Sequence, residues 1–177
     1  RQANEYKVPR MICANKMEKM GADFEYSIGS IHNRLAENAY PIVYPIGCED
    51  HFTGYIDLVT MKAYSYTGNA AQEVTEIEMP ADMADKAEEY RGKLIDAVAD
   101  FSDELMEQYL EGNEISVDLL KSTIRKATLA VKFFPVLCAD ALGNKGTRAL
   151  MDAVVDYLPS PLDIEAVKGI DANEKEV

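Results

Sequence analysis

Two short apolar runs, far apart in the sequence, constrain the fold of this chain more than any other feature. The first covers residues 8–14 and the second 133–138, and both are followed by polar residues. Continuous apolar runs of this length are typical of strands that are buried on both faces of a parallel sheet. The pattern therefore predicts an α/β protein whose two strands are separated in sequence by a long insertion.

The segment after the first run has helical spacing. Asp23 is a favourable N-cap, and apolar residues follow it at intervals of four, three and four, namely Phe24, Ile28, Ile31 and Leu35. Asn38 and Pro41 predict the end of this helix, and residues 42–46 predict the next strand. Residues 8–46 thus predict a β-α-β unit with parallel strands and a right-handed crossover.

The insertion has a different character. Residues 54–59, 62–67 and 73–78 favour an antiparallel meander, because they are rich in aromatic and β-branched residues. Pro80 opens a helical region, and Ser102 and Ser116 are suitable N-caps of two further helices. The predicted division is 1–47 and 133–160 for the α/β part, 48–132 for an inserted α+β subdomain, and 161–177 for a linker.

A last helix is predicted to begin at Thr147. Its expected buried face follows helical spacing and consists of Leu150, Met151, Val154, Val155 and Leu158. The tail from Lys168 has too little apolar content to pack, which is typical of a linker. The sequence begins with Arg1 and not with Met, and its first residues resemble the middle of a helix or strand. We therefore expect it to be a piece of a longer protein.

Composition excludes several classes of protein. The chain has 177 residues, 18 Lys and Arg against 31 Asp and Glu, and a net charge of −13, which argues against a surface that coats nucleic acid. No apolar run approaches the roughly 20 residues that a membrane-spanning helix needs. We therefore expect a soluble protein, and a monomer. Cys13, Cys48 and Cys138 are widely spaced and odd in number, so we expect buried free thiols and no metal site.

Polar loops follow both predicted strands of the parallel sheet. Asn15, Lys16 and Glu18 come after the first strand, and residues 138–146 come after the second. Ligands of open α/β sheets bind beyond the carboxyl ends of the strands. An Asn can hold a neighbouring loop, a Lys stem can lie across a flat base, and a carboxylate can accept two N–H bonds from a purine edge. A simple turn is the alternative for either loop alone.

These motifs together resemble translation elongation factor G over nearly the whole chain. The similarity is carried by Asn-Lys-Met-Glu at 15–18, Met-Gly-Ala-Asp-Phe at 20–24, Ile-Gly-Cys-Glu-Asp-His-Phe-Thr-Gly at 46–54, and the stretches at 56–58, 61–63, 144–146, 150–153 and 156–161. The insertion resembles the inserted subdomain of that factor. The resemblance implies the carboxyl-terminal part of a P-loop GTPase-type sheet with its inserted subdomain.

The resemblance also implies functional roles. Asn15, Lys16 and Glu18 match the guanine-recognising Asn-Lys-x-Asp motif, while Asp140, Ala141 and Leu142 match the second guanine loop, in which the Ala141 N–H meets the guanine carbonyl. Two residues depart from the pattern, because Glu18 replaces an Asp and Asp140 replaces a Ser. The implied protein is a cytoplasmic, ribosome-dependent GTPase that binds GTP or GDP with Mg²⁺ and moves tRNA and mRNA, which it contacts only indirectly.

The phosphate-binding part of such a site is missing from this sequence. No G-x-x-x-x-G-K-[ST] motif occurs, so we expect the chain by itself to hold no nucleotide and no catalytic residue. An alternative is a module of a divergent factor that binds the ribosome without depending on GTP. The Glu18 and Asp140 replacements leave both readings open, because two nearby carboxylates repel each other and alter the guanine site.

The insertion is also strongly acidic. Residues 80–118 hold 12 acids and 3 bases, a net charge of −9. A solvated helix surface is one interpretation. The other is a docking surface for a basic partner, centred on Asp82, Asp85 and Glu89, which helical spacing places on one face. The resemblance favours the ribosomal stalk protein as that partner.

Overall fold

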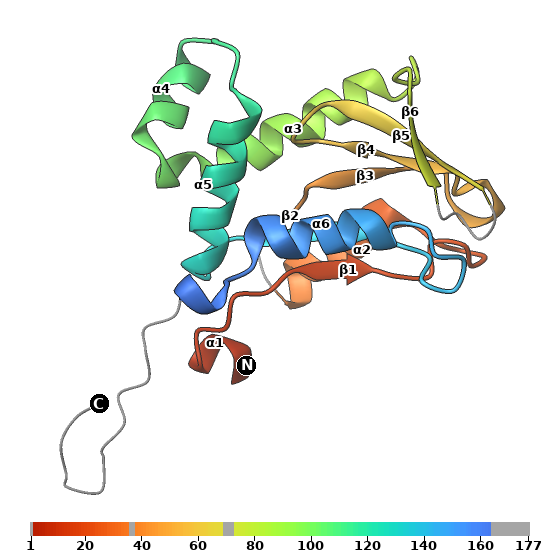
Figure 1. Cartoon of the computed structure of the whole chain (residues 1–177), viewed down its shortest axis with the longest axis horizontal. Coiled ribbons are helices and arrows are strands. Elements are labelled where there is room, and N and C mark those ends of the chain that lie inside the picture. The colour runs from red at the N-terminus through yellow and green to blue at the C-terminus, as the bar shows by residue number, and fades with distance from the viewer. Residues whose placement is uncertain (1, 36–37, 69–72, 164–177) are drawn as a thin grey trace, which may run out of the picture.

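The computed structural model describes residues 2–35, 38–68 and 73–163, and within them it contains two sheets (Figure 1). The α-helices are α1 (Gln2–Glu5), α2 (Phe24–Arg34), α3 (Ala84–Val98), α4 (Asp103–Leu110), α5 (Val117–Leu129) and α6 (Thr147–Tyr157). The strands are β1 (Ile12–Ala14), β2 (Ala39–Pro41), β3 (Val43–Ile46), β4 (Gly54–Asp57), β5 (Lys62–Thr67), β6 (Glu73–Ile77) and β7 (Phe134–Cys138). This is the predicted α/β class.

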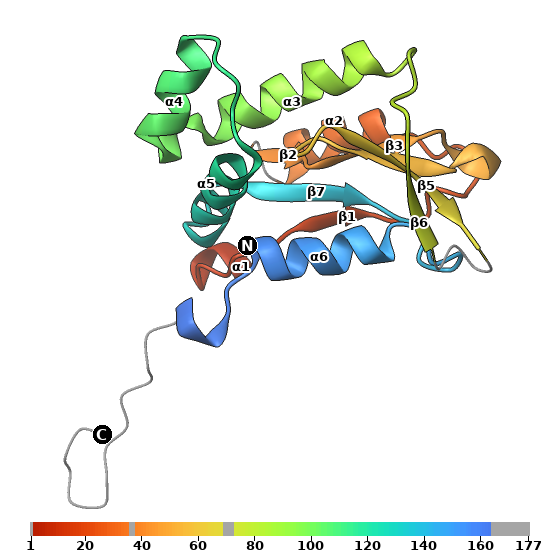
Figure 2. The same ribbon diagram turned by 45° about the horizontal axis from the view of Figure 1, so that its top comes forward.

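The first sheet is parallel, and its middle strand comes from the far end of the sequence. Its order is β1-β7-β2, with Ala14 level with Cys138. Every residue of β7 is buried, as its uninterrupted apolar sequence predicts. Helices α2 and α6 cover opposite faces of this sheet (Figures 1 and 2). After the long insertion, the chain thus returns to the parallel sheet, and β7 pairs with β1.

The predicted β-α-β unit needs a correction. The strand expected at 42–46 is β3, which lies not in the parallel sheet but in the antiparallel one, with order β3-β4-β5-β6. The second parallel strand is β2, at residues that the sequence indicated as the end of a helix. Between β2 and β3 the chain passes from one sheet to the other at Ile42, whose N–H donates to Val136 O at 3.0 Å.

The insertion otherwise follows the prediction. Strands β4, β5 and β6 form the antiparallel meander, although residues 69–72, between β5 and β6, lie outside the described residues. Ser102 and Ser116 cap α4 and α5, because their side chains accept hydrogen bonds from the N–H groups of Leu105 and Leu119. Tyr55 and Tyr64 stack across neighbouring strands, as expected of strand packing.

Helix α6 turns a different face inward from the one predicted. Its buried side chains are Ala153 and Tyr157, whereas Met151 and Val155 are 65% and 78% exposed. The helix is apolar on more than one side, so spacing alone could not choose the side that packs on the sheet. The predicted linker is described only as far as Asp163, in a short 3₁₀ turn. No helix of the described segments is both long and apolar enough to cross a bilayer.

Candidate functional site

The two predicted loops leave the same edge of the parallel sheet. Strands β1 and β7 are hydrogen-bonded neighbours and end in register at Ala14 and Cys138. Directly after the strands, backbone hydrogen bonds join the two loops: the Met17 N–H donates to Ala139 O at 3.1 Å, and the Ala139 N–H donates to Ala14 O at 2.9 Å. The structure therefore brings together the two segments that the sequence singled out.

Asn15 joins the loops through its side chain. Its Oδ1 accepts a hydrogen bond from the backbone N–H of Ala141 at 3.1 Å, across 126 residues of sequence. The expectation that an Asn here holds the neighbouring loop is confirmed. The same bond occupies the N–H that the resemblance assigns to a guanine carbonyl, so a bound base would have to share this donor.

Glu18 presents an unused acceptor. Its Oε2 is buried and accepts no hydrogen bond within the described part of the chain, while Oε1 lies 3.5 Å from Lys19 Nζ. The side chain is 20% exposed, so part of it still reaches the surface. A buried carboxylate oxygen without a donor is costly, and two N–H groups on one edge of a base would satisfy it.

The Asp140 side chain forms its hydrogen bond within its own loop. It is 4% exposed, and its Oδ1 accepts the Gly143 N–H at 2.8 Å. A Cβ at Gly143 would lie 2.2 Å from Asp140 Oδ2, so a side chain there would force this carboxylate to move. The carboxylate that replaces the expected Ser therefore closes the turn. Ala141 and Leu142 follow it at the surface, with Leu142 87% exposed.

A third segment, which the sequence did not assign to the site, supports both loops. It runs from residue 47 to 52 and contains a single 3₁₀ turn, Glu49–His51. The Glu49 N–H donates to Met17 O at 2.8 Å, and Glu49 Oε1 accepts from the Gly21 N–H at 2.6 Å. From the second loop, Lys145 Nζ donates to Phe52 O at 2.6 Å. In the sequence this segment stood out only as part of the stretch at 46–54 that resembles elongation factor G.

Three of the six non-glycine residues with a positive φ among the described residues lie at this place, and the other three, Lys7, Met61 and Val131, lie elsewhere. Lys16, Glu49 and Asn144 have φ angles of 69°, 54° and 58°, one in each of the three segments. Residues other than glycine rarely occupy this left-handed region, and those that do persist only where the surroundings determine them. Such residues cluster at binding sites, so the backbone supports a functional role for the loops.

The cysteines differ from the prediction in one case. All three are free thiols, with Cys138 buried and Cys13 half-buried, and burial raises the pKa of both. Cys48, however, is exposed, and it lies in the segment between β3 and β4, directly before the 3₁₀ turn Glu49–His51. The expectation that all three cysteines are buried is therefore wrong for Cys48.

The acids predicted to dock a partner are exposed but not equivalent. Asp85 and Glu89 lie on α3, whereas Asp82 lies in the turn before the helix begins. Glu89 is paired with Lys93, and Lys86 lies 3.7 Å away on its other side. The hydrogen bond from Lys93 lowers the pKa of Glu89. The lysines thus offset part of the negative charge at this position.

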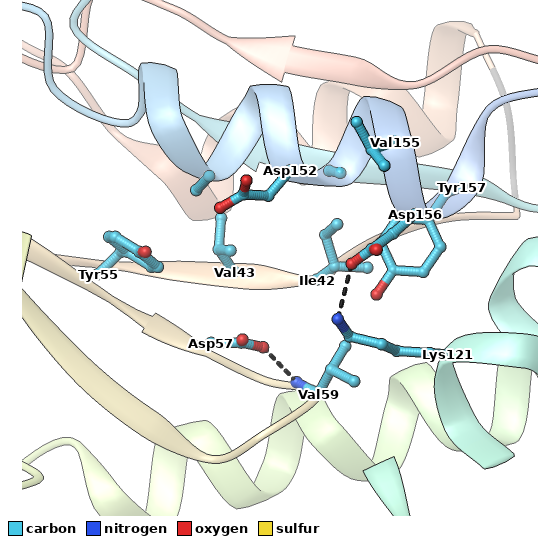
Figure 3. A pocket seen from close by; sticks show the side chains of 12 residues that line it. Ile42, Val43, Tyr55, Asp57, Val59, Lys121, Asp152, Val155, Asp156 and Tyr157 are labelled. Carbon is cyan, nitrogen blue, oxygen red and sulfur yellow. Dashed lines mark hydrogen bonds and ion pairs between the residues drawn. The ribbon is translucent and has the colours of Figure 1, made fainter. Parts of the chain in front are cut away.

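A cavity of about 370 Å³ lies between the insertion and α6 (Figure 3). Its charged groups are Asp57, Asp152, Asp156 and Lys121, and Lys121 Nζ lies 2.7 Å from Asp156 Oδ2. The hydrogen bond with Asp156 raises the pKa of Lys121. The pair connects α5 to α6, and residues of β3, β4 and α6 line most of the rest of the cavity.

Comparison with known proteins identifies relatives of this arrangement. The family model described as the elongation factor Tu GTP binding domain matches residues 1–160. Among solved structures, a protein from Thermus thermophilus has a TM-score of 0.78 at 27% sequence identity and covers 91% of this chain. The chain spans 24% of the length of that protein.

Proposed function

This chain belongs to the family of elongation factor Tu GTP-binding domains, and from that premise we propose that it supplies the guanine-recognising part of a larger translational GTPase. The α/β architecture agrees with the P-loop GTPase fold of the family. The observation that carries the proposal is the joining of two loops by the Asn15–Ala141 hydrogen bond, beside the unused Glu18 oxygen. The loops lie at the strand ends where such sheets bind ligands.

The residues present fit a guanine base. The Glu18 carboxylate would accept the two N–H groups of the guanine edge, which satisfies its buried Oε2. The aliphatic part of Lys16 would lie across the ring, and the amide of Asn15 would face the base while its oxygen holds Ala141. Asp140 would act indirectly, by closing the turn that presents Ala141 and Leu142.

Phosphates and Mg²⁺ would be held outside this sequence. Backbone N–H groups of a phosphate loop supply much of the affinity for a nucleotide, and no such motif occurs here. We therefore propose that GTP hydrolysis needs the longer protein and that no catalytic residue lies in this chain. Bound GTP would supply the phosphoryl group that is transferred to water, and this hydrolysis would drive the conformational cycle of the longer protein.

The parent protein that we propose is similar to elongation factor G and promotes movement of tRNA and mRNA on the ribosome in the cytoplasm. Support comes from the insertion, whose sheet and helices separate β2 from β7. We retain the division into 1–47 with 133–160, 48–132 and 161–177, although β3 pairs with the inserted sheet. A shorter GTPase domain would need no such segment.

The test is nucleotide hydrolysis by the full-length protein with and without ribosomes. We expect ribosomes to stimulate GTP hydrolysis and to leave ATP unhydrolysed. Absence of stimulation, or equal hydrolysis of ATP, would contradict a role as a translational GTPase.

We further propose that the acidic insertion binds the ribosomal stalk protein through Asp82, Asp85 and Glu89. Because all three are exposed, the encounter would be weak and salt-dependent, with screening over a Debye length of about 8 Å at physiological ionic strength. Changing the three acids to Lys should slow association. The matched control changes Glu107, Glu111 and Glu114 to Lys. Equal effects of the two triple variants would show that association depends on the net charge of the insertion and not on a docking surface at Asp82, Asp85 and Glu89.

A further inference from the structure

A short segment at the start of the insertion and the residue before it touch both proposed guanine loops, and we call residues 47–52 the brace. Glu49 contacts the first loop at two points, through its N–H to Met17 O and through its carboxylate to the Gly21 N–H. Phe52 contacts the second loop, because its carbonyl accepts from Lys145 Nζ. The brace is therefore the part of the insertion placed to influence base recognition.

The shape of the brace is fixed by packing. Gly47 has a φ of 76°, and a Cβ there would lie 1.9 Å from His51 O, so only glycine fits. Phe52 is fully buried and anchors the other end in the core. Glu49, held between them at a φ of 54°, keeps a conformation that a side chain disfavours. A rigid turn thus presents the Glu49 carboxylate in one direction.

The two contacts of Glu49 lie on either side of Glu18, the proposed acceptor of the guanine N–H groups. Met17 O and the Gly21 N–H mark the beginning and the end of a tight turn, and Glu18 lies between them. Met17 is itself 3% exposed, so its side chain holds the start of the turn in the core. The end of the turn is held by Glu49 through the Gly21 N–H and by the Ala22 N–H, which donates to Lys19 O at 3.0 Å, while no other group lies within 4 Å of a Cβ position at Gly21.

We propose that Glu49 is a positioning residue for guanine recognition, which fixes the 17–21 turn so that the Glu18 carboxylate faces the N–H groups of the base. This inference rests on the proposed guanine role of Glu18. The inserted subdomain then takes part in nucleotide selection, in addition to any partner that it binds. The bond has a charged acceptor, which makes it stronger than a neutral hydrogen bond.

The test uses the full-length protein with Glu49→Ala, Glu49→Gln and the neighbouring Asp50→Ala as control. Asp50 lies in the same turn. GDP affinity is compared with the affinity for inosine diphosphate, which lacks the 2-amino group from which the Glu18 carboxylate would accept a hydrogen bond. We expect Glu49→Ala to weaken GDP roughly tenfold and inosine diphosphate clearly less, on the scale of one charged hydrogen bond. Glu49→Gln keeps an acceptor oxygen and should restore part of the GDP affinity.

Several outcomes would overturn the inference. If Glu49→Ala binds GDP like the wild type, or weakens both nucleotides equally, Glu49 does not position Glu18. A wild-type protein that binds no GDP refutes the proposed function itself, and the inference with it. Amide hydrogen exchange in this chain gives a second readout without nucleotide. The Gly21 amide should exchange faster in Glu49→Ala than in Asp50→Ala, and equal rates would contradict the bond on which the inference rests.

Discussion

Asn15 is predicted to have two separable roles, and a pair of substitutions distinguishes them. Asn15→Ala removes the oxygen that accepts the Ala141 N–H at 3.1 Å, whereas Asn15→Asp keeps an acceptor at that place and removes the amide N–H groups. One net hydrogen bond contributes about 1 kcal/mol, so Asn15→Ala should lower the free energy of unfolding by about that amount. For a chain of this size the melting temperature should fall by about 2–4 °C.

The assay is thermal unfolding of this chain together with GDP titration of the full-length protein. Asn15→Asp should unfold like the wild type, yet both variants should bind GDP at least about tenfold more weakly, which corresponds to about 1.4 kcal/mol. Asn113→Ala is the control, because the Asn113 side-chain amide donates to Glu111 Oε2 in an exposed turn away from the two loops. The reasoning is refuted if Asn15→Asp destabilises the chain as much as Asn15→Ala, or if GDP affinity is unchanged in both.

Three further predictions concern the fold. Gly143→Ala should destabilise the chain when Asp140 is present and much less in combination with Asp140→Ala, because the clash at 2.2 Å is with that carboxylate; a double-mutant cycle by urea unfolding measures the difference. Ile124→Ala should cost about 2–5 kcal/mol in the same assay, since Ile124 is fully buried. The pKa of Lys121 is raised, so its pair with Asp156 stabilises the fold at pH values below the ordinary lysine pKa of 10.5. This stabilisation is lost as the pH rises through the raised pKa of Lys121. Asp156→Asn should therefore reduce the alkaline fall in melting temperature, measured by thermal unfolding at a series of pH values.

Much of the fold followed from local sequence signals. The Asp23 N-cap is confirmed by its bond from the Tyr26 N–H, and the helix begins at the next residue. The insertion could be predicted as strands followed by helices because its caps and its apolar spacing are local. The polar loops after β1 and β7 were also predicted, because a strand end is marked by an abrupt change from apolar to polar residues.

The errors arose where tertiary contacts decide. Residues 39–46 contain two strands in two sheets, and nothing in a continuous β-rich run marks the change at Ile42. Helix α6 has apolar side chains around much of its surface, so the buried side depends on what the rest of the molecule covers. Glu49 could not be assigned to the site from spacing, because its contacts with Met17 and Gly21 join segments 28 or more residues apart.

The central claim is that the loops containing Asn15, Glu18 and Ala141 recognise guanine, and calorimetric titration of the full-length protein with GDP and ADP tests it most directly. A site that hydrogen-bonds one base should reject the other, so GDP is predicted to bind roughly a hundredfold more tightly or better than ADP. In Glu18→Ala most of that preference should disappear, because the proposed acceptor for the guanine edge is removed. Equal affinity for GDP and ADP in the wild type, or a full preference for GDP in Glu18→Ala, would contradict the account.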